Sequence, residues 1–207
     1  MTTNNLIIRN AAQMVTCSGF AAKRGAEMAD LKIIEDGALV IEDGVIRAVG
    51  PTGKVLEGLD TAGYTVIDAA GKAVLPGFVD SHTHFPFGGY RPEEYSWRLG
   101  GMPYMEIMQK GGGIVNTMAA TRKASPEELV RLGRQRLDAM LAMGVTTVEG
   151  KSGYGLDLET EIKQLEVMAH LDAEHPVDVV RTFLGAHAVP PEYKGRPDDY
   201  IDFVMEK

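Results

Sequence analysis

Two histidines, His82 and His84, are the residues of this sequence whose types and spacing point most directly to chemistry. They follow an apolar run, Ala73 to Val79, which has the composition of a strand buried on both faces. Side chains at positions i and i+2 of a strand share one face, so both imidazoles can aim at one point. Imidazole suits zinc and iron, and a catalytic site keeps one metal position open for water. The pair predicts part of a metal site, and a hydrogen-bonded pair is the alternative.

The composition limits the ligands and partners that are available. The chain has 207 residues, of which 44% are hydrophobic and 24% are charged, and this is typical of a globular protein with a real core. A formal charge of -8 argues against nucleic acid or an anionic membrane as the partner. No apolar run approaches the roughly 20 residues of a membrane span, and the N-terminus lacks the pattern of a secretory signal. We therefore expect a cytoplasmic protein that acts on a small molecule.

Cysteine usage narrows the metal chemistry further. Cys17 is the only cysteine, which excludes an internal disulfide and a cysteine-rich metal site. No neighbour of Cys17 in the sequence supplies a base that would make it a nucleophile. Any metal must therefore be held by histidine, aspartate or glutamate side chains.

The first 70 residues read as an all-β region. Short apolar runs alternate with turn signals, and Asp43-Gly44 between two of the runs is a strong hairpin signal. The expected strands lie around Leu6–Ile8, Ala38–Ile41, Val45–Val49 and Tyr64–Ile67. We place a domain boundary near residue 70, which gives a β-domain over residues 1–70 and a second domain over residues 71–207.

The second domain alternates strands with helices, which predicts βα units and a parallel sheet. Ser125, Pro126 and Glu128 form a capping-box signature at the start of one helix, and Gly144 fits its end. The strands are expected over residues 73–79, 145–149 and 177–184, and the helices over residues 104–109, 125–143, 158–170 and 198–206.

Polar groups follow each of these three strands. The histidine pair follows the first, Lys151 to Gly155 follows the second, and Gly185 to His187 follows the third. Functional groups of parallel α/β folds collect at the carboxyl ends of strands, so the three clusters are expected to share one rim. His170 and His175 flank a helix end, where a structural role is favoured. Glu149 is expected to face the barrel interior, and Lys151 to form a structural ion pair.

The motifs on this rim resemble the imidazolonepropionase family of the amidohydrolase superfamily, and the resemblance runs through essentially the whole chain. The His-x-His pair alone indicates only the superfamily, whereas the segments Lys151 to Leu156 and Gly185 to Tyr193 are far more specific. The segments that carry the resemblance are Val79 to His84, Phe87 to Arg91, Gly111 to Ile114, Thr121-Arg122, Lys151 to Leu156 and Leu184 to Tyr193.

The resemblance implies an α/β fold: a small β-sandwich domain plus the first three βα units of a (β/α)₈ amidohydrolase barrel. The implied reaction is hydrolysis of 4-imidazolone-5-propanoate to N-formimidoyl-L-glutamate in histidine degradation, by water that a divalent zinc or iron ion activates. His82 and His84 are the implied metal ligands, and Arg91, Tyr154 and His187 the implied substrate-binding residues. Alternatives are a surface role for Arg91, ring packing for Tyr154 and a structural role for His187.

The sequence departs from the family pattern at Pro86 and at Gly150, without changing the spacing of the named residues. A complete barrel takes about 250 residues, so residues 71–207 supply only part of one. The expected third metal histidine, the glutamate and the metal-bound aspartate lie beyond residue 207, so the catalytic acid and base are unassigned. The isolated chain is expected to be inactive.

The resemblance suggests a homodimer as the full-length protein, and a complementary C-terminal chain is the other expected partner. Two further functions stay open: a non-catalytic fragment or scaffold that needs a complementary chain, and an amidohydrolase acting on another cyclic amide.

Overall fold

The structure, a computed structural model, describes residues 5–19 and 21–207. The chain divides into two compact units, Met1–Pro76 and Gly77–Lys207. None of the helices in the described ranges has the length and apolar character that crossing a membrane requires.

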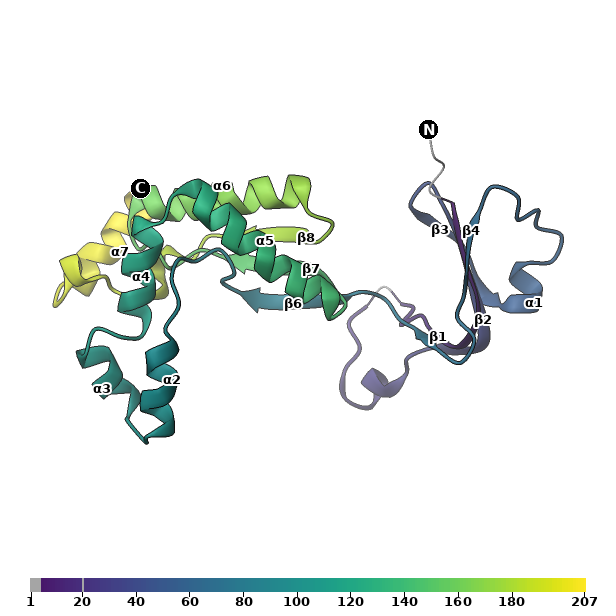
Figure 1. Ribbon diagram of the computed structural model, residues 1–207, viewed down its shortest axis with the longest axis horizontal. Helices are drawn as coiled ribbons and strands as arrows, with labels where there is room; N and C mark the ends of the chain where they lie inside the picture. The colour runs from purple at the N-terminus through teal and green to yellow at the C-terminus, as the bar shows by residue number, and fades with distance from the viewer. Residues whose placement is uncertain (1–4, 20) are drawn as a thin grey trace. The chain divides into compact units, whose positions relative to one another are not determined.

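The first unit is built on one mixed sheet with the strand order β3-β2-β1-β4, and β5 also pairs with β1 (Figure 1). The predicted hairpin is confirmed, because β2 and β3 pair antiparallel and Asp43 and Gly44 between them have φ of 50° and 78°. The elements are β1 (Leu6–Val15), a 3₁₀ helix η1 (Gly25–Ala29), β2 (Ile33–Glu42), β3 (Val45–Pro51), α1 (Thr52–Val55), β4 (Thr65–Asp68) and β5 (Ala73–Val74).

The second unit contains a three-stranded parallel sheet in the order β6-β7-β8. Its strands are β6 (Phe78–Thr83), β7 (Val145–Lys151) and β8 (Asp178–Thr182). Its helices are α2 (Pro92–Leu99), α3 (Tyr104–Gln109), α4 (Ile114–Lys123), α5 (Pro126–Ala142), α6 (Leu158–Glu174) and α7 (Pro197–Glu206), with 3₁₀ turns η2 (Gly185–His187) and η3 (Pro191–Tyr193).

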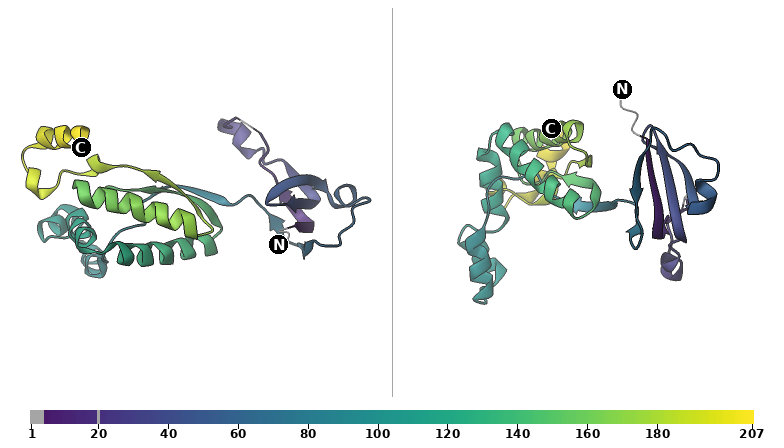
Figure 2. Two further views of the ribbon diagram at one scale, coloured as in Figure 1. Left: turned by 90° about the horizontal axis from the view of Figure 1, so that it is seen from above. Right: turned by 45° about the vertical axis from the view of Figure 1, so that its right-hand side comes forward.

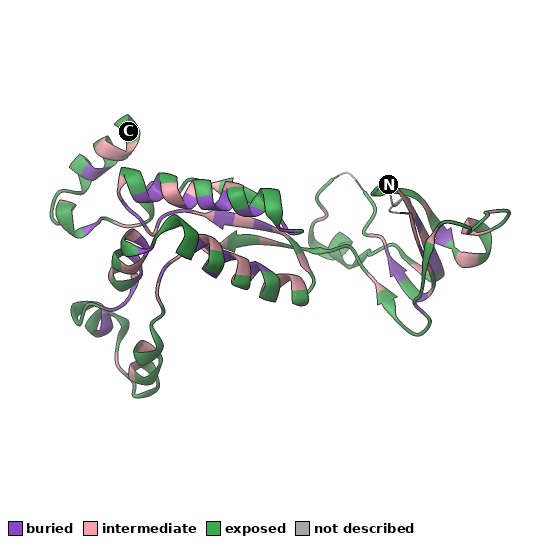
Figure 3. Ribbon diagram, turned by 45° about the horizontal axis from the view of Figure 1, so that its top comes forward, coloured by how far each residue is buried: buried purple, intermediate pink, exposed green. Residues whose placement is uncertain are grey.

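Helices α5 and α6 pack side by side on one face of the parallel sheet (Figure 2). Their inward faces and β7 carry most of the buried positions of this layer (Figure 3). The core between them includes Phe85, Leu137, Val148, Met168 and Leu171. Burying such side chains stabilises each by about 1.5–3 kcal/mol, so this packing fixes where the strand ends and their loops lie.

The caps of the two long helices explain where they begin. The predicted cap of α5 is confirmed, because the Ser125 side chain accepts a hydrogen bond from the backbone N–H of Glu128 at 3.2 Å. At the start of α6, Asp157 accepts from the N–H of Thr160 at 2.7 Å. Because α6 begins directly after Asp157, the residues before it are confined to a short loop.

The fold class is the expected one, an α/β chain with a small β unit followed by three βα units of an incomplete barrel. Among the described residues the parallel sheet is open at both edges, β6 and β8. Helices α2 and α4 were not expected from the sequence. Pro92 at the first helical position and the acidic first turn of α2 are the signals that could have predicted it.

The expected strand from Ala73 to Val79 is wrong in two respects. Ala73 and Val74 pair with β1 in the first unit, so the units divide after Pro76 rather than near residue 70. The barrel strand begins at Phe78, and it is not buried on both faces, since Phe78 is 55% and Val79 68% exposed. The physical reason is that β6 is an edge strand of this sheet and that, in the described part of the chain, α5 and α6 cover one of its faces.

Candidate functional site

The two histidines lie at the carboxyl end of β6, where the strand is irregular. The register of β6 against β7 shifts between Asp80 and Thr83, so one extra residue of β6 opposes β7 there. His82 lies within this irregular stretch, and its backbone N–H donates to the Asp80 carboxylate at 3.2 Å. His84 directly follows the strand. The imidazole centroids are 5.9 Å apart. Although the strand is not regular, the rings still lie near each other.

His84 is enclosed by other rings of the rim. It stacks on Tyr154 with ring centroids 4.6 Å apart, and it meets the His187 ring edge-on at the same centroid distance. Burial and the nearby His187 together lower the pKa of His84 to about 4, and the Ser152 backbone offsets part of this effect. His84 is therefore a neutral imidazole at physiological pH, which is the form that ligates metals.

Both ring nitrogens of His84 are buried and make no hydrogen bond of normal geometry within the described part of the chain. A buried polar nitrogen without a partner costs roughly 1–3 kcal/mol. Its free lone pair fits the role of a metal ligand. The donor set is partial, because residues 5–19 and 21–207 contain no group of three or more histidine, cysteine or acidic side chains that could hold a metal ion.

The loop after β7 places the Tyr154 ring against the rings of His84 and His187. Burial raises the pKa of the Tyr154 phenol, so the ring is neutral. Gly153 has φ of +103°, and a Cβ on it would lie 2.8 Å from the Leu184 carbonyl oxygen and 2.9 Å from the His187 Cβ. Only glycine allows the backbone to approach His187 this closely.

Glu149 and Lys151 lie on β7 beside the histidines. The Lys151 ammonium and the Thr182 hydroxyl both donate to the Glu149 carboxylate, and these contacts lower the Glu149 pKa. The expected structural ion pair of Lys151 is confirmed.

His187 lies in η2, the 3₁₀ turn that follows β8. Two contacts hold this turn: the Leu184 N–H donates to the Ser152 hydroxyl at 2.9 Å, and the Tyr200 hydroxyl donates to the Gly185 carbonyl at 2.6 Å. Burial lowers the pKa of His187. His187 is exposed as a residue, while its ring edge meets His84, so it can present one side to a ligand.

Arg91 is the residue before α2, and Glu94 in the first turn of that helix orients it. The Arg91 guanidinium donates to the Glu94 carboxylate at 3.1 Å, and the other carboxylate oxygen accepts from the Gly113 N–H at 2.8 Å. Glu94 therefore ties Arg91 to the start of α4. The sequence reasoning missed Glu94, although its spacing of three residues from Arg91 is the signal for such a pair on a helix.

One cavity of about 410 Å³ joins the three residues expected to bind substrate. Arg91, Tyr154 and His187 all line it, and Glu94, Arg98, Tyr104 and Thr117 are further lining residues that sequence reasoning did not single out. His84 is not among its lining residues, but it contacts two of them, Tyr154 and His187. A guanidinium at one part of the cavity and aromatic rings at another suit a small ligand with a carboxylate and a planar ring.

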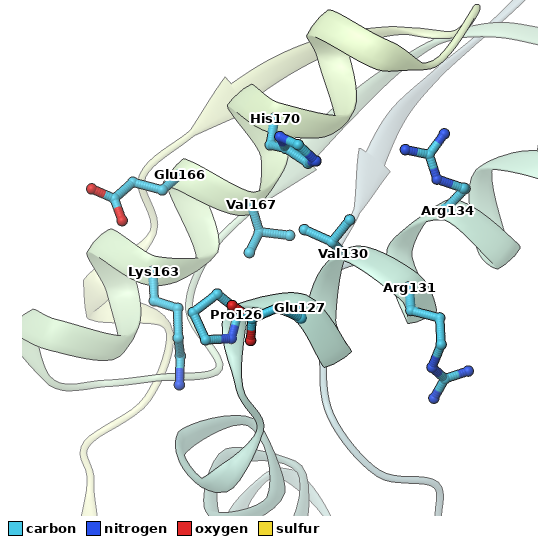
Figure 4. Close-up of a pocket in the computed structure, with 9 residues that line it drawn as sticks. All are labelled: Pro126, Glu127, Val130, Arg131, Arg134, Lys163, Glu166, Val167 and His170. Carbon is cyan, nitrogen blue, oxygen red and sulfur yellow. The ribbon is translucent and has the colours of Figure 1, made fainter.

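A separate groove of about 500 Å³ lies between α5 and α6 (Figure 4). Val130 and Val167 face each other across it, and Arg131, Arg134 and His170 stand around them. None of the five expected site residues lines this groove, so it is not part of the candidate site. His170, which the sequence places outside the site, lies here as a half-exposed partner of Glu174.

Comparisons with known proteins relate the chain to amidohydrolases. A model of the Amidohydrolase family matches residues 65–103. An imidazolonepropionase of Parabacteroides distasonis is 62% identical over 207 residues, which are 100% of this chain and 50% of that protein. An imidazolonepropionase of Clostridium tetani is 54% identical over 206 residues, 100% of this chain and 49% of that protein. The chain thus spans about half the length of the curated relatives it matches.

Solved structures with the same fold are more distant in sequence. E. coli guanine deaminase has a TM-score of 0.59 with 16% identity, over 96% of this chain and 42% of that one. A. niger ochratoxinase has a TM-score of 0.53 with 16% identity, over 87% of this chain and 31% of that one. These two likenesses concern the fold alone.

Proposed function

These 207 residues are the counterpart of the N-terminal half of imidazolonepropionases, and we propose that they supply the substrate cavity and two metal ligands of a cyclic-amide hydrolase. The reaction is hydrolysis of 4-imidazolone-5-propanoate to N-formimidoyl-L-glutamate in histidine degradation. The observation that supports this most strongly is the single cavity lined by Arg91, Tyr154 and His187.

Arg91 binds the propanoate group of the substrate. A guanidinium offers a carboxylate two parallel hydrogen bonds, and such charged contacts contribute about 1.5–3 kcal/mol. Glu94 already holds one side of Arg91 at 3.1 Å, so the guanidinium is oriented before substrate arrives. This lowers the entropy lost on binding.

Tyr154 and His187 hold the five-membered ring of the substrate. Both rings border the cavity, with centroids 5.6 Å apart. Tyr154 offers a face to a planar ring, and His187 offers a ring nitrogen for a hydrogen bond to the ring carbonyl or nitrogen. The ring then lies beside His84, which contacts both residues.

His82 and His84 are two ligands of one divalent ion, zinc or iron. When bound, such an ion polarises the ring carbonyl and lowers the pKa of its water toward 7. His84 keeps its lone pair free for this role because neither ring nitrogen makes a hydrogen bond of normal geometry among the described residues. The remaining ligands and the general base come from a complementary segment, either in the same polypeptide or in a separate chain.

The test separates binding from turnover. The chain is titrated with imidazole-4-propanoate, a probe that has the ring and the propanoate but no amide to hydrolyse, and a saturable complex that depends on Arg91 is expected. The zinc- or iron-loaded chain is then assayed alone and mixed with the C-terminal half of the Parabacteroides distasonis relative. Imidazolonepropanoate turnover is expected only in the mixture.

Three results contradict the proposal. If the mixture hydrolyses dihydrouracil, a cyclic amide without a carboxylate, but leaves imidazolonepropanoate intact, the chain serves another cyclic-amide hydrolase. If the mixture associates but turns over neither compound, the chain acts as a scaffold. Stoichiometric metal and turnover from the isolated monomeric chain would show that the site is not divided.

A further inference from the structure

A buried carboxylate on α6 holds the loop that carries Tyr154. Glu161 is only 4% exposed, and it lies in the first turn of α6. Its carboxylate accepts backbone N–H groups from Gly153 at 2.9 Å, Gly155 at 2.9 Å and Leu156 at 2.8 Å. The three donors surround Tyr154 in sequence, so one side chain fixes the backbone on both sides of it.

This arrangement uses the charge of the carboxylate. A buried ionised group is costly unless hydrogen bonds satisfy it, and Glu161 receives them from three backbone donors near the positive end of α6. The loop also has a conformation that needs such support, because Gly153 has φ of +103° and Leu156 has φ of 57°.

Gln164, one helical turn further along α6, connects the loop of Tyr154 to the segment after β6 that contains His84. It is 0% exposed. Its amide oxygen accepts the Tyr154 N–H at 3.3 Å, and its amide nitrogen donates to the Pro86 carbonyl at 2.9 Å. Pro86 is two residues beyond His84, so this single side chain joins the backbones of the two loops whose rings stack.

We propose that Glu161 and Gln164 are a positioning pair that sets the ring of Tyr154 against His84 and holds it at the substrate cavity. Neither residue lines that cavity, so both act through Tyr154. The role deepens the proposed function and rests on it, since the cavity is taken to bind the ring of a cyclic amide.

Glu161→Gln is the decisive variant. Glutamine keeps the shape of the side chain. Its NH₂ group, however, must face a backbone N–H that donates to the carboxylate in the wild-type chain, so the loop around Tyr154 has to shift. Glu159→Gln is the matched control, because Glu159 lies in the same first turn, is exposed, and loses the same charge. Gln164→Met, which removes the bridge to Pro86 while filling similar volume, is the second variant.

Each 207-residue variant carries 3-fluorotyrosine, and the ¹⁹F resonance of Tyr154 is identified by its loss in Tyr154→Phe. Circular dichroism and thermal unfolding check that each variant is folded. The expected result is a moved Tyr154 resonance and about tenfold weaker binding of imidazole-4-propanoate in Glu161→Gln and Gln164→Met, with both unchanged in Glu159→Gln.

Two outcomes overturn the inference. In the first, Glu161→Gln and Gln164→Met fold but leave the Tyr154 resonance in place. In the second, the wild-type chain binds the probe and both variants bind it as tightly as Glu159→Gln does. A wild-type chain that binds no probe overturns the proposed function instead. In that case the Tyr154 resonance alone decides the positioning role, which is supported if the resonance moves in Glu161→Gln and not in Glu159→Gln.

Discussion

The imidazole of His84 stacks on the ring of Tyr154, with centroids 4.6 Å apart and ring planes inclined by 27°. A candidate metal ligand and a candidate substrate contact thus share one interface. They come from different loops, after β6 and after β7, and the packing of α5 and α6 on the sheet brings those loops together. The burial of the His84 ring therefore depends on Tyr154.

Removing the Tyr154 ring is expected to expose His84. In the wild-type chain both nitrogens of His84 are buried, so diethylpyrocarbonate should modify the exposed His170 first. Tyr154→Ala should make His84 react at a rate similar to that of His170, whereas Tyr154→Phe keeps the stacked ring and the protection. Mass spectrometry of peptides measures each rate. Equal His84 rates in both variants would contradict this dependence.

Replacing Arg91 is expected to weaken carboxylate binding. Arg91→Ala should raise the dissociation constant for imidazole-4-propanoate about 10–100-fold, because a charged contact of about 1.5–3 kcal/mol is lost. Arg91→Lys should recover only part of the affinity, since an ammonium cannot form the two parallel hydrogen bonds. Arg131→Ala, at an exposed arginine that lines the separate groove and not this cavity, is the control and should change little. Calorimetry gives the constants, and an unchanged Arg91→Ala would remove Arg91 from the site.

Gly153→Ala is expected to disrupt the rim, either through backbone strain at positive φ or through overlap of the new Cβ with its neighbours. Gly195→Ala separates these two causes. Both glycines have positive φ, +103° and +79°, but a Cβ at Gly195 would meet nothing within 4 Å, whereas one at Gly153 would overlap His187 and Leu184. Both substitutions carry a backbone penalty of about 1–3 kcal/mol for a residue with a Cβ at positive φ. Gly153→Ala should cost about 1–3 kcal/mol more from the overlap, measured by urea unfolding. Equal costs would show that the loop moves freely.

The sequence predicted the parts of this molecule that depend on local signals. The hairpin turn at Asp43-Gly44 and the cap at Ser125 are such signals, and both are confirmed. The strand from Ala73 to Val79 was misjudged because its first two residues pair with β1, at Gln13 and Met14, sixty residues earlier. An apolar run cannot indicate which sheet it will join.

The candidate site shows the same limit. Its five expected residues were found through motifs, but the residues that hold them were not. Glu94 and Gln164 bond to backbone groups 19 and 78 residues away, and Glu161 bonds to the N–H groups of a loop that precedes its own helix. Such contacts leave no short pattern in the sequence. Asp157 is the exception, because an aspartate followed three residues later by a threonine, before a helical stripe, is a local capping signal.

His175 is expected to support the fold at the far end of α6 from the site loop, with no part in binding. Its ring accepts the Val177 N–H at 3.1 Å and lies 3.1 Å from the Asp138 carboxylate, joining α5 to the start of β8. His175→Ala should destabilise the chain by about 2 kcal/mol, because a buried donor is left unpaired. His170→Ala, at a half-exposed position, should cost close to nothing. Thermal unfolding compares the two, and probe affinity should stay at the wild-type value in both.

The ion pair between Arg122 and Glu192 is expected to make stability depend on acid pH. The Arg122 guanidinium, which also donates to the Gly155 carbonyl at 2.7 Å, holds the Glu192 pKa below its usual 4.5. A carboxyl group whose pKa is lowered by folding stabilises the native state above its unfolded pKa, and this contribution is lost as pH falls through the folded pKa. The wild-type chain should therefore exceed Glu192→Gln in stability at about pH 7, and the difference should shrink by about pH 3.

The size of this difference is expected to be small, because the Glu192 side chain is 55% exposed and solvent screens the pair. Glu166→Gln removes an exposed glutamate of α6 and serves as the control, since it leaves the Arg122 contacts in place. Urea unfolding of the three proteins across this pH range measures the effect. A difference between wild type and Glu192→Gln that stays constant with pH would mean that folding does not lower the Glu192 pKa.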